Sequence, residues 1–176
     1  MLAVAAGCEA NPLAPPLWTA VTDTAVIYSL AKPQLDLLSA FNFRERAPVR
    51  IETTGGATQW DIALDTRAGQ LVLLPPGALG VQSAGRIMRL ANSTFASVEE
   101  APKDTLVYSA TQALPVDLKS VYVIKTDRRV TEFGGACSYY AKMAPIAADV
   151  AAGTLRFIYD ASPLCNDRKL VPPDTT

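Results

Sequence analysis

Hydrophobic residues recur mostly at every second position of this chain, which is the period of β-strands rather than of α-helices. Residues 59–65 (QWDIALD) set Trp60, Ile62 and Leu64 against Asp61, Ala63 and Asp65. This alternation predicts a strand that buries the face with Trp60, and it leaves Asp61 on the other face near the strand end, where it can accept hydrogen bonds from backbone or arginine groups. An unbroken apolar run at 71–74 follows an Ala-Gly turn and stops at Pro-Pro-Gly, which predicts a second, fully buried strand.

Further strands are expected along most of the chain. The patterns predict strands at 24–30, 49–52, 105–109, 114–118 and 120–126, and a closing hairpin whose arms are 138–143 and 154–160. The segment 78–103 is ambiguous, because GRIMRL fits either a strand or a helical turn. TFASVEEAP fits a short helix with Thr94 as its N-cap.

Short strands separated by glycine and proline turns indicate an all-β fold. The chain has 176 residues, with 13 prolines and 10 glycines, and this length suits a single domain. We therefore predict an antiparallel β-sandwich, or a partly open barrel, over residues 20–170. A proline-rich tether is expected at 9–19 and a short tail at 171–176.

Charge and composition exclude several classes of function. The net charge is −1 with both signs interspersed, so the basic face of a nucleic-acid-binding protein is missing. No apolar run reaches the roughly 18–20 residues of a membrane-spanning helix. The chain contains no histidine, which excludes Ser–His–Asp and Cys–His catalysis, histidine zinc sites and an imidazole ligand to haem.

The N-terminal residues MLAVAAGC resemble the end of a bacterial lipoprotein signal, in which small and apolar residues precede a cysteine that is acylated. The resemblance implies that residues 1–8 are the remnant of a signal ending at Cys8, that Cys8 is lipidated and becomes the mature N-terminus, and that the domain is attached to a membrane of the cell envelope. An alanine-rich N-terminus with a chance cysteine is the alternative interpretation.

With Cys8 set aside, Cys137 and Cys165 remain as a pair. In an exported protein such a pair most often forms a disulfide. A two-cysteine metal site and two buried free thiols are the alternatives, and no further metal ligands accompany the pair in the sequence.

Three segments in order resemble HmuY-like proteins, all-β lipoproteins of the bacterial envelope of which some capture haem. They are WDIALDTRAGQLVL, SVYVIKTDRRV and YYAKMAPIAADVAAGTLRFIYDAS. The resemblance implies the all-β fold and the envelope location. Haem-binding members supply paired axial histidines or methionines, and this chain has no histidine.

The candidate ligand-binding residues are therefore few. Met88 and Met143 are the candidate thioether ligands of a haem iron, although methionine is more often a core residue. Tyr139 and Tyr140 are the candidate phenolate ligands, with packing as the simpler role. Lys142 lies among these aromatics, and we expect its amine to reach the surface.

We accordingly expect a non-enzymatic envelope lipoprotein that binds a small-molecule or protein ligand through loops at one end of the sandwich, with no catalytic residue, metal or nucleic-acid partner. The first alternative is a carrier of haem or of another small apolar ligand. The second is a hydrolase that uses carboxylates, for which Asp160 and Asp167 beside Cys165 are the candidates, although pairing of aspartate with Arg168 explains that segment more simply.

Overall fold

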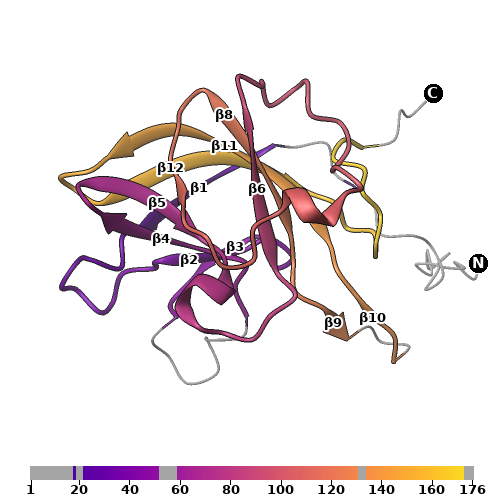
Figure 1. Ribbon diagram of the computed structural model, residues 1–176, viewed down its shortest axis with the longest axis horizontal. Coiled ribbons are helices and arrows are strands. Elements are labelled where there is room, and N and C mark those ends of the chain that lie inside the picture. Colours follow the sequence, from indigo (N-terminus) through magenta and orange to yellow (C-terminus); the bar gives the residue numbers. More distant parts are fainter. Residues whose placement is uncertain (1–17, 19–21, 52–58, 131–133, 173–176) are drawn as a thin grey trace, which may run out of the picture.

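A computed structural model describes residues 18, 22–51, 59–130 and 134–172. It has two antiparallel five-stranded sheets that pack as a sandwich (Figure 1). The predicted fold class is confirmed. Among the described residues, no helix has the length and hydropathy that a membrane crossing requires. Cys8, most of the tether and most of the tail lie outside the described residues. So does Gly55-Gly56, a glycine pair at which the sequence predicts a turn before residue 59.

The first sheet has the strand order β1-β12-β11-β8-β6. Its strands are β1 (Asp23–Tyr28), β6 (Arg86–Ala91), β8 (Ser120–Lys125), β11 (Tyr140–Asp149) and β12 (Thr154–Ala161). The predicted closing hairpin is present, and its first arm extends beyond the predicted end at residue 143 to Asp149, which pairs with Thr154. The ambiguous GRIMRL segment is strand β6.

The second sheet has the order β3-β2-β4-β5-β7. Its strands are β2 (Ala40–Asn42), β3 (Ala47–Val49), β4 (Ile62–Arg67), β5 (Gln70–Leu74) and β7 (Leu114–Pro115). A separate two-stranded ribbon joins β9 (Arg129–Val130) to β10 (Ala136–Cys137). Two 3-10 turns, η2 (Pro76–Leu79) and η3 (Thr105–Val107), complete the described elements.

Four sequence-based element assignments are wrong in kind or in extent. The strand expected at 49–52 ends at Val49 in β3, and the strand expected at 114–118 ends at Pro115 in β7. The segment 105–109 is not a strand, because Asp104 accepts a hydrogen bond from the Leu106 amide and starts η3 there. Local capping by an aspartate thus outweighs the β preference of the residues that follow it. The helix expected after Thr94 is a single turn, in which the Thr94 hydroxyl accepts from the Ser97 amide.

The main core lies between the sheets and is rich in aromatic rings. Phe41, Phe43, Phe157 and Tyr159 pack mostly edge to face, with ring centroids 4.8–6.4 Å apart. The face with Leu155, Phe157 and Tyr159 is buried as the alternation predicts. Edge-to-face contact adds specific geometry to ordinary apolar burial, so this cluster holds the two sheets in one arrangement.

The sandwich is closed along one side and open along the other. On the β1 side, the Leu30 amide donates to the Leu64 carbonyl, which joins the two sheets by a backbone hydrogen bond. The opposite side is bordered by β6 and β7, the last strands of their sheets. Residues 105–114, which we call the crossing segment, run across this open side. Ser109 of this segment forms an isolated bridge with Ile87.

Candidate functional site

The open side of the sandwich holds a pocket of about 520 Å³. Its volume lies within the range of about 300–1,000 Å³ that is usual for small-molecule sites. One wall is the first half of β6, and the other is the crossing segment with Leu114 of β7. The lining residues are Arg86, Ile87, Met88, Arg89, Leu106, Val107, Tyr108, Ser109, Ala110, Thr111, Gln112 and Leu114.

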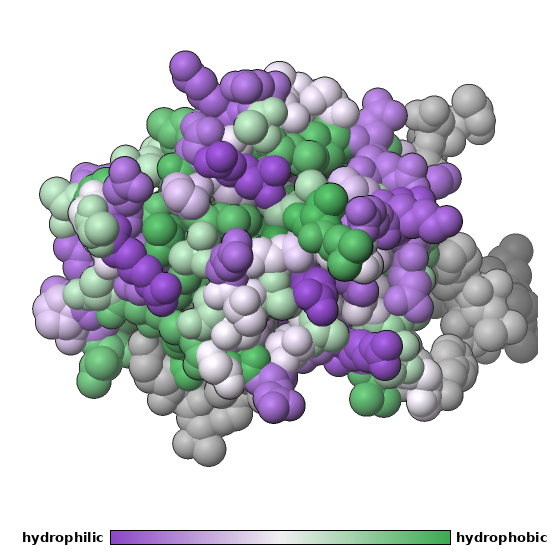
Figure 2. Space-filling view, viewed as in Figure 1, coloured by the Kyte–Doolittle hydropathy of each residue, from purple (hydrophilic) through white to green (hydrophobic). Residues whose placement is uncertain are grey.

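The pocket combines exposed apolar side chains with cations. Leu106 is 90% exposed and Val107 is 50% exposed, although both are aliphatic. Figure 2 shows apolar side chains gathered over the position of η3 and bordered by hydrophilic ones. Arg86 and Arg89 supply positive charge from the β6 wall. Of the described residues that line the pocket, none carries a carboxylate, thiol or imidazole group.

The wall geometry follows from where the crossing segment meets β6. The Ile87 amide donates to the Ser109 carbonyl and the Ser109 amide donates to the Ile87 carbonyl, at 2.9 and 2.7 Å. These two bonds hold residues 105–112 against β6 at a single point. Gly77 packs against Ala110, and a Cβ there would lie 2.4 Å from the Ala110 carbonyl oxygen, so the turn after β5 supports the crossing segment from behind.

The two candidate haem ligands lie on opposite faces of one sheet. Met88 belongs to the apolar cluster on the outer face, whereas Met143 is buried in the core between the sheets. The strand register agrees, because Met88 pairs with Val123 while Met143 pairs with the adjacent Tyr122. Since neighbouring residues of a strand point to opposite faces, these two sulfur atoms are not brought together.

The two candidate tyrosines are also separated by the sheet. Tyr140 packs in the outer cluster, where burial raises the pKa of its hydroxyl. Tyr139 precedes β11, and the Arg44 guanidinium lies 4.9 Å from its ring centroid. Both side chains are buried, and neither belongs to the main core between the sheets.

Trp60 is buried, as predicted, but on a different face from the predicted one. It is 2% exposed and packs with Ala40, Ala63, Val72 and Leu74 on the outer side of the second sheet, whereas Ile62 and Leu64 face the main core. The reason is that β4 begins at Ile62, so the alternation does not extend back to Trp60.

Asp61 is fully buried, and its carboxylate bonds to two other segments of the chain. It accepts a 2.8 Å hydrogen bond from the Phe43 amide, and its other oxygen lies 3.2 Å from an Arg129 nitrogen. The predicted backbone and arginine partners of Asp61 are therefore confirmed. Burial raises the pKa of Asp61 from 3.8 to about 6, against the opposing effect of Arg129.

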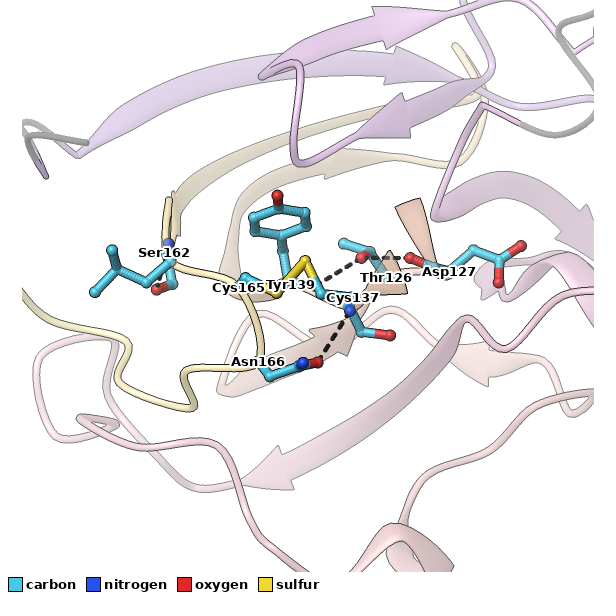
Figure 3. The surroundings of a disulfide bond; sticks show 9 residues. Thr126, Asp127, Cys137, Tyr139, Ser162, Cys165 and Asn166 are labelled. Carbon is cyan, nitrogen blue, oxygen red and sulfur yellow. Dashed lines mark hydrogen bonds between the residues drawn. A yellow bond between two sulfur atoms is a disulfide. The ribbon is translucent and has the colours of Figure 1, made fainter. Parts of the chain in front are cut away.

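The disulfide between Cys137 and Cys165 is present and attaches the C-terminal segment to β10 (Figure 3). Beside it, the Ser138 amide donates to the Asn166 side chain and the Asn166 amide donates to the Ser138 carbonyl. The Tyr139 amide donates to the Thr126 hydroxyl, which links the same region to the end of β8.

The C-terminal segment and the residues after β6 together cover the outer face of the first sheet. We call residues 94–108 and 162–170 the outer cover. The Ala101 amide donates to the Arg168 carbonyl, the Leu170 amide donates to the Glu99 carbonyl, and Arg168 forms an ion pair with Glu100. The cover buries Met88, Val121, Val123 and Tyr140 beneath Val98, Ala101, Tyr108 and Leu170.

Lys142 holds the outer cover from below rather than reaching the surface. Its Nζ donates to the carbonyls of Phe95 and Val98 at 2.9 and 2.8 Å, and it lies 4.5 Å from the Phe95 ring centroid. The residue is buried, and this burial lowers the pKa of the amine. The long stem passes among apolar residues while the ammonium group satisfies two turn carbonyls.

The carboxylates suggested for a hydrolase do not converge. Asp160 lies 3.2 Å from the Trp18 indole nitrogen and 3.8 Å from an Arg46 nitrogen. The side chain of Asp167 accepts from the Lys169 amide within its own turn. The expected pairing of Arg168 with an aspartate is wrong, since Glu100 is its partner.

Fold and site together define this chain as an antiparallel β-sandwich with a pocket on its open side. No protein-family model matches the sequence, and no curated protein is similar to it. Among the described residues, no group of three or more cysteine, aspartate or glutamate side chains is arranged to hold a metal ion.

Proposed function

We propose that this protein is a non-enzymatic ligand-binding module of the bacterial cell envelope, with its ligand held in the pocket on the open side of the sandwich. The pocket itself carries this proposal. It sets exposed aliphatic side chains, led by Leu106, opposite a strand that bears two arginines. Concave sites with apolar walls and a few polar groups are the usual form of small-molecule sites.

The position of the reactive side chains supports binding rather than catalysis. Lys142, Asp61 and Asp160 are buried and engaged in hydrogen bonds or ion pairs. None of the three lines the pocket in the described part of the chain. A general acid or base has to reach its substrate directly or through one water, and these groups are committed to holding the fold.

Two features support the envelope location. The disulfide suits an exported protein, because such bonds persist in oxidising compartments. The lipoprotein-like N-terminal sequence would place acyl chains on Cys8, with the proline-rich residues 9–19 as the tether. The resemblance to HmuY-like proteins agrees with this location. We propose attachment through Cys8 on these grounds.

Binding in the pocket can be tested with a neutral fluorescent probe, N-phenyl-1-naphthylamine. We expect saturable binding with one site per chain. Leu106→Asp should weaken it about tenfold, because a carboxylate would be desolvated against the probe. Leu118→Asp is the matched control, since Leu118 is also exposed but lies outside the pocket. Equal affinity in both variants, or no saturable binding, would refute the pocket.

A further inference from the structure

Two cations lie side by side where β6 meets β8. Arg86 is the register partner of Lys125 in this antiparallel pair, so their side chains project from the same face of the sheet. Both are half-buried. Like charges directly opposite each other destabilise a sheet, and partial burial strengthens the repulsion by lowering the local dielectric. This pair therefore costs the unliganded protein stability.

Three other partly buried cations of the described chain have acidic partners. Arg129 pairs with Asp61, Arg46 with Asp160, and Arg168 with Glu100. In the part of the chain that the structure describes, no carboxylate lies within ion-pair distance of Arg86 or Lys125. The repulsion between these two cations is thus not offset from within the described fold.

The pair stands at the edge of the pocket. Arg86 itself lines the pocket, followed along β6 by Met88 and Arg89, and the exposed side chains of Leu106 and Val107 line it from the crossing segment. We propose that Arg86 and Lys125 bind the oxyanion headgroup, a carboxylate or a phosphate, of an amphipathic ligand whose apolar part lies against Leu106 and Val107. This inference rests on the proposed function and names the ligand class.

The chemistry of the two cations fits this role. A guanidinium binds carboxylate or phosphate oxygens through two parallel hydrogen bonds, and an ammonium adds a second, compact charge. A bound anion would convert the repulsion between Arg86 and Lys125 into two attractions. A ligand with only an apolar part would leave the repulsion in place.

The test compares decanoate with 1-decanol, which share a chain and differ in headgroup charge at pH 7.5. Using isothermal titration calorimetry on the full chain, we expect decanoate to bind at least about tenfold more tightly than decanol. Arg86→Gln/Lys125→Gln should remove this preference, so that decanoate and decanol bind within about twofold of each other. Raising the salt concentration should weaken decanoate binding selectively.

The matched control is Lys119→Gln/Arg128→Gln, which removes the same two charges from exposed positions outside the pocket. It should retain the preference for decanoate. Equal binding of decanoate and decanol to the unmodified protein would overturn the anion site while leaving the pocket intact. Binding of neither compound would overturn the proposed function as well.

Stability supplies a readout that does not depend on ligand. Because Arg86→Gln relieves the repulsion, it should raise the melting temperature of the free protein by about 1–3 °C. An unchanged or lower melting temperature would contradict the proposed repulsion between Arg86 and Lys125 in the free protein. Decyl phosphate then distinguishes the two oxyanions. Tighter binding of decyl phosphate than of decanoate assigns a phosphate headgroup, and weaker binding assigns a carboxylate. In either case, Arg86→Gln/Lys125→Gln should abolish the difference in affinity between the two ligands.

Discussion

At the scale of single residues, the neighbours Trp60 and Asp61 contribute to the fold in different ways. Trp60 fills the outer side of the second sheet with apolar surface, and burial of so large a side chain contributes on the order of 2–3 kcal/mol or more. Asp61 links three segments, because it bonds to the Phe43 amide and to Arg129 of the β9–β10 ribbon. The dipeptide therefore joins β4 to two distant parts of the chain.

The raised pKa of Asp61 makes stability depend on pH. Since the folded pKa of about 6 exceeds the ordinary 3.8, the folded protein binds this proton more tightly than the unfolded chain does between these values. The contribution of Asp61 to stability is therefore fully present below about pH 4 and lost as the pH rises through 6. The change amounts to about 3 kcal/mol.

The measurement is urea unfolding of the wild type and of Asp61→Asn at several values between pH 4 and pH 7.5. The free energy of unfolding of the wild type should fall relative to that of the variant across this interval. Asp36→Asn, at an exposed carboxyl, is the control and should run parallel to the wild type. Parallel curves for all three proteins would contradict the account of Asp61.

At the scale of elements, the outer cover depends on distant segments meeting over one sheet. The disulfide fixes one end of residues 162–170. The hydrogen bonds of the Ala101 and Leu170 amides join the two segments of the cover to each other. Lys142 adds two hydrogen bonds from the sheet below. Four buried side chains of the sheet face are kept from water by this arrangement.

Loss of the disulfide should therefore loosen the cover before the sandwich. The bond joins residues 28 apart, and a closed loop of this length contributes about 3–4 kcal/mol in the chain-entropy model. In Cys137→Ser/Cys165→Ser, we expect that loss in urea unfolding, with faster hydrogen exchange at the Ala101 and Leu170 amides. The core amides of β4 should exchange only as fast as the global loss of stability requires. Uniform acceleration at all sites would show that the cover is not a separate unit.

The sequence predicted the long, regular strands better than the short elements. Alternation was sufficient for β1, β8 and β12 because their inner faces bury a repeated side-chain pattern. It missed β2, whose three residues are too few to show a period, although Phe41 within it is central to the core. It also misassigned η3, where a side-chain cap decides the local structure.

At the scale of the whole molecule, the open side of the sandwich decides where a ligand can lie. The pocket brings together β6 and residues 106–114, and the charge pair adds Lys125 from β8. The sequence could not predict this site, because it arises from the strand order that places β6 and β7 at the open side. Met88 is the one sequence-selected ligand candidate that lines the pocket.

The placement of the methionines has a direct consequence for haem. Since Met88 and Met143 face opposite sides of one sheet, they cannot serve as paired axial ligands in this fold. Titration with hemin should produce no Soret shift that depends on both sulfur atoms. A saturable shift that Met88→Ala and Met143→Ala each abolish would contradict this arrangement.

The most direct test of the central claim is to locate a bound ligand on the molecule. In a titration of ¹⁵N-labelled protein with decanoate, the largest amide shift changes should fall in β6 at residues 86–89 and in the crossing segment at 106–112. They should saturate together with a single affinity. Saturable changes centred elsewhere, such as around Trp60 or at residues 162–170 of the outer cover, or the absence of any, would contradict a ligand site on the open side of the sandwich.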